Sequence, residues 1–142
     1  MRGVVVRQAV SSIALVCAVL ASACAAEVAE EDDGMEAVSF ALTVQPLIDQ
    51  TCNCHQTSPI LMAPFSLKPG EAYDNLVSKP SAQVMTMALV TPGSLNESYL
   101  WHKLNGTQLE VGGLGAQMPS TLPLDAEDLH VFELWIASGA AR

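Results

Sequence analysis

The segment TCNCH at residues 51–55 constrains this chain most, because it places two cysteines and a histidine side by side. The chain has 4 cysteines, and the other two, Cys17 and Cys24, lie in an apolar N-terminal stretch. Only Cys52 and Cys54 therefore remain for a folded domain. Two cysteines separated by a single residue make a poor disulfide, because the loop between them is too tight for the required geometry. Their proximity is either accidental or the sign of a binding site.

The N-terminus has the features of an export signal. Arg2 and Arg7 supply positive charge, and an apolar run interrupted only by serines extends over residues 9–26. The small residues at 21–23 form the A-x-A pattern that is typical of a cleavage site. We therefore predict that residues 1–23 are a signal peptide. The apolar run is long for such a signal, so an uncleaved membrane anchor is the alternative.

Cys24 suggests a second form of processing. A small residue precedes it, as in a bacterial lipobox, in which the cysteine becomes the lipidated first residue. The leucine that is usual three positions earlier is absent, since Ala21 stands there. Residues 24–38 contain a run of like charge and are expected to be a flexible acidic tether. Two locations stay open: a soluble periplasmic protein, or a lipoprotein anchored to a membrane through Cys24.

The charge of the chain excludes one class of partner. The formal net charge is -9 at pH 7. Nucleic acids and anionic membrane surfaces repel such a protein, so we expect no nucleic-acid partner. A basic protein partner remains compatible with this charge.

Residues 39–142 are expected to form one domain, because about 100 residues is a usual domain size. Apolar residues recur at helical spacing, and no alternating strand pattern is present. Ser94 and Glu97 form a capping box, which predicts a helix start there. Asp125 is placed to cap the last helix, and Gly139 to end it. We predict an all-α fold with long loops. The expected helical segments are 40–48, 70–77, 94–104 and 125–138.

Motifs of several enzyme classes are missing from the sequence. It contains no phosphate-binding loop, no G-x-S-x-G elbow and no zinc-type repeat of cysteine pairs. The carboxylates that follow Asp125 are explained by a helix start, where they suit the helix dipole. His102 and His130 are expected at helix surfaces. The residues that remain for a binding site are those of segment 51–55 and a methionine, Met118, that follows a glycine-rich loop.

Taken in order, the short motifs of this chain resemble those of bacterial c-type cytochromes, whose attachment motif is C-x-x-C-H. Cys54-His55 is followed by an Ala-Tyr helix at 72–76 and a Pro-Gly-Ser turn at 92–94. A glycine-rich approach to Met118-Pro119 comes next, and then a closing segment with Trp135. No single motif is specific, but their order covers nearly the whole expected domain.

The resemblance implies a cytochrome c-like fold, with about four or five short helices and long loops around a haem pocket. It implies one haem c, with His55 as the proximal iron ligand and Met118 as the distal one. Cys54 is the implied thioether to the haem, and Cys52 is a second candidate. The implied function is electron transfer between redox protein partners outside the cytoplasm, by a carrier rather than an enzyme.

The spacing of the two cysteines departs from the family motif by one residue. Positions i and i+3 lie about 60° apart around a helix, whereas i and i+2 lie about 160° apart. Both sulfurs therefore cannot reach one haem from an ordinary helical turn, and Thr51 stands where the first cysteine belongs. Three hypotheses stay open: one thioether from Cys54, a distorted attachment that also uses Cys52, and a domain that has lost haem.

Two functions outside haem binding also stay open. Cys52, Cys54, His55 and Met118 are soft ligands of the kind that copper binds, which would suit a periplasmic copper-binding protein. Alternatively, the domain is a haem-less interaction module held at a membrane through Cys24.

Overall fold

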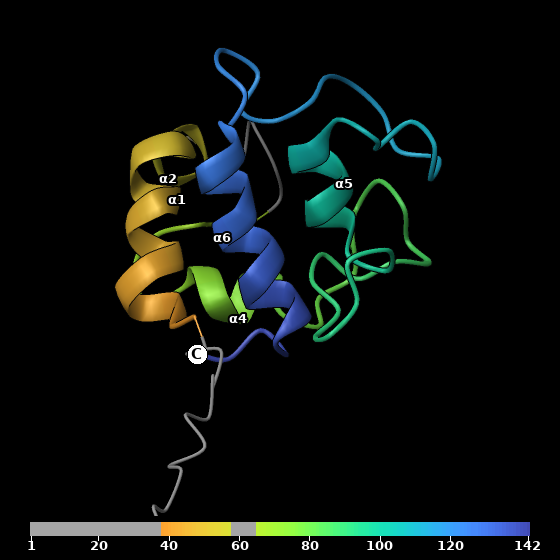
Figure 1. Ribbon diagram of the computed structural model, residues 1–142. Coiled ribbons are helices and arrows are strands. Elements are labelled where there is room, and N and C mark those ends of the chain that lie inside the picture. Colours follow the sequence, from red (N-terminus) through yellow and green to blue (C-terminus); the bar gives the residue numbers. More distant parts are fainter. Residues whose placement is uncertain (1–37, 58–64) are drawn as a thin grey trace, which may run out of the picture. The chain divides into compact units, whose positions relative to one another are not determined.

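The computed structural model describes residues 38–57 and 65–142 (Figure 1). The predicted signal peptide at 1–23, Cys24 and all of the predicted tether except Val38 lie outside these residues. None of the helices in the described ranges is both long and apolar enough to cross a membrane.

The described residues form five short α-helices and one π-helical turn, joined by long loops. In chain order they are η1 (Phe40–Val44), α1 (Gln45–Thr51), α2 (Cys54–Thr57), α4 (Ala72–Leu76), α5 (Tyr99–Asn105) and α6 (Ala126–Ala137). Between residues 65 and 142 the backbone makes only isolated β-bridges, such as Val77 with Val90. The prediction of an all-α domain with four or five short helices and long loops is therefore confirmed for the part of the chain that is described.

Local sequence accounts for where some of the helices begin. The Ser39 hydroxyl accepts a hydrogen bond from the amide of Leu42 at the start of η1. Pro46 lies in the first turn of α1, where its missing N–H costs nothing because first-turn amides have no partner within the helix. Asp125 caps α6 by accepting from the amide of Asp128, which confirms the prediction for this helix.

The predicted start of the helix that contains Tyr99 is wrong. Helix α5 begins at Tyr99, and Ser94 does not cap it. Instead, the Ser98 hydroxyl donates to the carbonyl of Ser94 and accepts from the amide of Thr91. These bonds hold residues 91–98 in a turn. The hydroxyl of Ser98 is fully buried and provides hydrogen-bond partners for backbone groups of that turn.

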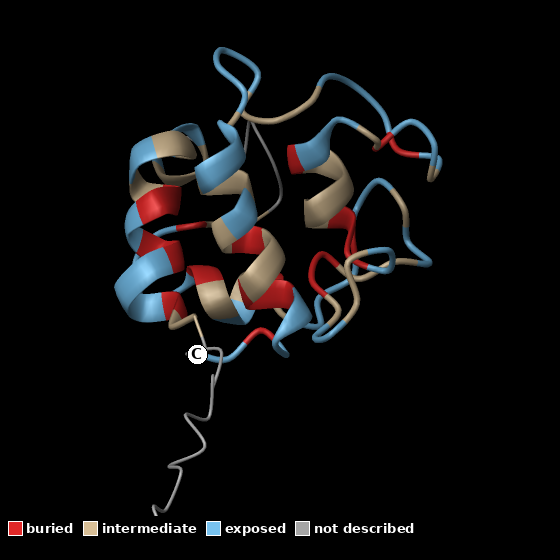
Figure 2. Cartoon of the chain, in the orientation of Figure 1, coloured by how far each residue is buried: buried red, intermediate tan, exposed pale blue. Residues whose placement is uncertain are grey.

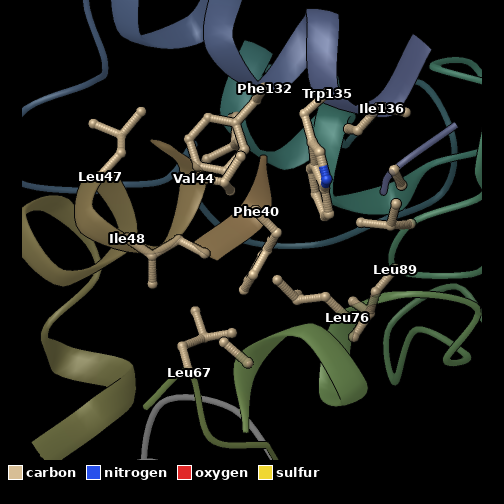
Figure 3. Close-up of a cluster of buried hydrophobic side chains, with 14 of the residues drawn as sticks. Phe40, Val44, Leu47, Ile48, Leu67, Leu76, Leu89, Phe132, Trp135 and Ile136 are labelled. Carbon is tan, nitrogen blue, oxygen red and sulfur yellow. The ribbon is translucent and has the colours of Figure 1, made fainter. Parts of the chain in front are cut away.

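Helix α6 is the centre of the hydrophobic core. It packs against η1 and α5, and in Figure 1 it lies between α1 and α5. Phe132, Trp135 and Ile136 on its inner face are almost completely buried, and Figure 2 shows buried residues on the facing sides of its neighbours. Figure 3 shows Phe40 of η1 near Trp135, and the two ring centroids are 5.2 Å apart.

Candidate functional site

A mostly apolar cavity lies where the first two α-helices and α5 come together. Its wall is formed by the end of α1, by α2, by residues 65 and 67, by residues 81–83 and 89, by α5 and by Met118. The cavity has a volume of about 150 Å³ and is open to solvent on one side. Cofactor sites commonly have volumes of about 300–1,000 Å³. A large occupant would therefore extend beyond this cavity through its open side.

A tight turn between α1 and α2 brings a cysteine and a histidine into the cavity wall. Helix α1 ends at Thr51, with Cys52 as its C-cap, and α2 begins at Cys54. The carbonyl of Cys52 accepts a hydrogen bond from the amide of His55 at 2.9 Å. Residues three apart in such a turn lie on the same side of it. Accordingly, Cys52 and His55 both line the cavity, whereas Cys54 is exposed and does not.

His55 has the surroundings of a neutral imidazole. Its ring stacks on Phe65, with the centroids 5.7 Å apart and the planes 14° from parallel. Burial lowers the pKa of His55, because the charged form loses hydration. The Nδ1 atom is buried and has no hydrogen-bond partner among the described residues. An orphaned ring nitrogen is uncommon in a folded protein, and a histidine that binds an iron or copper ion must be neutral.

Cys52 lies in a less polar position than Cys54. Its Sγ is 3.5 Å from the hydroxyl of Thr51. Burial is the largest influence on this thiol and raises its pKa, and the hydrogen bond with Thr51 opposes that rise in part. Cys52 is therefore a protonated thiol at neutral pH.

Met118 reaches the cavity from a loop that is anchored on α5. Its amide donates to the carbonyl of Lys103 at 2.9 Å, and the side-chain amide of Gln117 donates to the carbonyl of Leu104 at 2.7 Å. A third bond runs from the Gln108 side chain to the carbonyl of Gly115 at 2.9 Å. This loop is long, but its end is held at several points next to the cavity.

One part of the cavity wall is polar. The hydroxyl of Tyr99 donates to Gln83, whose Oε1 also accepts from the amide of Leu114 at 3.1 Å. The Lys103 ammonium donates to the carbonyl of Leu114 at 2.6 Å, and burial lowers its pKa. Gly113 packs so closely that an added Cβ would lie 2.4 Å from the Tyr99 hydroxyl. Gln83 and Lys103 could not be predicted from the sequence, because neither belongs to a motif.

The three residues predicted from the cytochrome-like motifs therefore fall in different places. His55 and Met118 line one cavity although they are far apart in the sequence, and Cys54 lies outside it. Cys52, the second candidate, lines the cavity. His102 is engaged elsewhere, because its ring nitrogens contact the Thr107 hydroxyl and the carbonyl of Asn96. His130 is exposed and pairs with Glu133.

Comparisons with known proteins give no match: no family model, no curated protein and no solved structure is similar to this chain.

The side chains around the cavity are of the types that haem sites use, although the cavity itself is small. The wall is mostly apolar, as a porphyrin requires, and it carries one imidazole, one thioether and one thiol. No residue within 38–57 or 65–142 hydrogen-bonds to the buried Nδ1 of His55. Within residues 38–57 and 65–142, no three side chains of His, Cys, Asp or Glu are grouped so that they could hold a metal ion by themselves.

Proposed function

We propose that this chain is an exported, haem-binding electron carrier with a cytochrome c-like fold. It binds one haem c, with His55 and Met118 as the axial ligands and one thioether from the cysteine pair. The observation that carries the proposal is that His55 and Met118, which are distant in the sequence, line a single mostly apolar cavity beside a cysteine.

Each ligand has a separate role in this proposal. His55 supplies a neutral imidazole, kept neutral by burial and oriented by its stacking on Phe65. Met118 supplies a thioether, which favours the reduced iron and suits electron transfer rather than oxygen chemistry. The bound haem would supply one-electron redox chemistry, and the apolar wall would keep water from the iron.

The polar part of the wall suits the acidic edge of a haem. Lys103 offers an ammonium group and Gln83 a side-chain amide on the same cavity wall, and the Tyr99 hydroxyl positions Gln83 by donating to its Oε1. A negatively charged propionate loses hydration when it leaves water, and a positive charge beside it compensates for that loss. Lys103 in the cavity wall would provide such a charge in a chain whose formal net charge is -9.

The open mouth of the cavity fits exchange of electrons with protein partners. Electrons pass between proteins where a cofactor comes close to the surface, and this cavity is not closed. The negative charge of the chain would favour redox partners with a basic docking surface.

Export rests on the sequence of residues 1–23. The mass of the mature N-terminus would show whether the chain starts at Cys24 and carries lipid.

The copper hypothesis has less support from the geometry. It needs Cys52, Cys54, His55 and Met118 as a common set of ligands, and Cys54 lies outside the cavity that holds the other three. A copper site would therefore require the turn between α1 and α2 to rearrange. The haem-less interaction domain has no observation that favours it.

The test is to produce the full chain in a bacterial host that carries a cytochrome c maturation system. We expect a coloured protein with about one haem per chain, and the haem should stay with the protein after acid-acetone extraction. Elemental analysis for copper belongs to the same experiment. Colourless protein from this host would refute haem binding, and stoichiometric copper without haem would support the copper hypothesis.

A further inference from the structure

We infer that Cys52, and not Cys54, is the residue that bonds to the haem. This inference rests on the proposed function and adds the identity of the attachment residue. The family resemblance points to the cysteine next to the histidine, which is Cys54. The geometry of the turn points to the other cysteine.

The first argument is the position of the two side chains. Cys52 lines the same cavity as His55 and Met118, whereas Cys54 does not line it and is exposed. A cofactor seated against His55 in this cavity can be joined only to a sulfur that faces the cavity. Cys54 would reach it only if the first turn of α2 unwound, and the amide of Thr57 holds that turn by donating to the carbonyl of Asn53 at 3.0 Å.

The second argument is the shape of the turn. If the chain from residue 51 to 55 were one regular helix, Cys52 and Cys54 would point in nearly opposite directions. The chain leaves α1 at Cys52 and starts α2 at Cys54. The hydrogen bond from the His55 amide to the Cys52 carbonyl closes the turn between the two helices. This turn places Cys52 and His55 on the same side of the chain. The short spacing of the two cysteines is then no obstacle to attachment, since only the first one is used.

The chemistry of attachment needs no additional reagent beyond the haem itself. The Cys52 sulfur forms a bond to one carbon of a haem vinyl group, and the thiol hydrogen is transferred to the other vinyl carbon. The carbon–carbon double bond becomes a single bond, so atoms and electrons balance without an oxidant or reductant. Cys54 remains a free, exposed thiol in the loaded protein.

The experiment compares the full-length wild-type chain with Cys52→Ser, Cys54→Ser and the double variant, all produced with the maturation system. Tandem mass spectrometry of the haem-bearing peptide identifies the modified residue, and the reduced pyridine complex distinguishes one thioether from two. We expect one thioether, located at Cys52. Cys54→Ser should keep wild-type levels of covalent haem, and Cys52→Ser should fall to the level of the double variant.

Two results would overturn the inference while leaving the proposed function intact: haem bonded to Cys54, or two thioethers in the wild-type protein. Wild-type protein without any haem would overturn the proposed function and the inference with it. The peptide mass of the wild-type chain decides the question even if a serine variant fails to fold.

Discussion

At the residue scale, the site depends on which side chains the turn between α1 and α2 directs inward. The sequence alone could name His55 and Met118 as candidates, because the order of a Cys-His pair and a later Met-Pro is informative. It could not show that Cys52 faces the cavity. That position depends on α1 ending at Thr51, and the end of a helix is set by tertiary packing as well as by local propensity.

The different surroundings of the two cysteines predict different reactivity. In haem-free protein, iodoacetamide should modify Cys54 several-fold faster than Cys52 at pH 8. Cys54 is exposed, whereas burial raises the pKa of Cys52 and so reduces the thiolate that reacts. Peptide fragmentation after timed labelling measures the two rates. In urea the rates should become similar, and equal rates in the folded protein would contradict the position of Cys52.

At the element scale, the helices differ in how well the sequence predicted them. Helix α6 begins as expected because Asp125 caps it with a local hydrogen bond. Helix α5 begins later than expected because the buried Ser98 bonds to Thr91 and Ser94 in the turn that precedes it. A capping pattern is a local signal, and here the hydrogen bonds of Ser98 outweighed it.

A polar clasp, which consists of the side chains of Gln45, Asp49 and Gln56, joins α1, α2 and the segment that contains Leu67. The Oδ1 atom of Asp49 accepts from the side-chain amides of Gln45 at 2.7 Å and Gln56 at 2.6 Å. The same two amides also donate to the carbonyl of Leu67, each at 3.2 Å. Gln56 is the neighbour of His55 in α2, so this clasp fixes the helix that presents the histidine.

Removing the shared acceptor should destabilise the fold. We expect Asp49→Ala to lower the free energy of unfolding by about 1.5–3 kcal/mol, because two amides lose a charged partner in a partly buried place. Asp49→Asn keeps an acceptor oxygen and should cost less. Urea unfolding followed by circular dichroism measures both variants.

The matched control for this prediction is Asp74→Ala. Asp74 pairs with Arg142 on the surface, where both side chains are more than 60% exposed. An exposed pair of this kind contributes about 0–1 kcal/mol. If Asp49→Ala cost no more than Asp74→Ala, the clasp would not hold α2 in place.

At the scale of the whole molecule, the cavity is a product of tertiary structure. Its wall combines residues from the end of α1 to Met118, and α6 packs against both η1 and α5. Periodicity predicted most of the helices but not α2 or the relative placement of the helices. The sequence therefore could predict an all-α class and candidate ligands, whereas the polar wall of Gln83, Tyr99 and Lys103 became visible only in the folded chain.

The central claim is that a haem iron lies between His55 and Met118, and the axial ligands can be observed directly. The measurement compares the oxidised absorption spectrum and the reduction potential of wild-type protein, Met118→Leu and Met85→Leu. Met85 is a suitable control because it is 84% exposed and does not line the cavity. Its substitution tests the loss of a methionine without touching the site.

We predict that the wild-type protein and Met85→Leu share the weak red absorption band of a methionine-bound ferric haem. Met118→Leu should lose that band and have a reduction potential lower by on the order of 100 mV, within the range of about 0.8 V that axial ligands control. A haem spectrum and potential that Met118→Leu leaves unchanged would contradict the account.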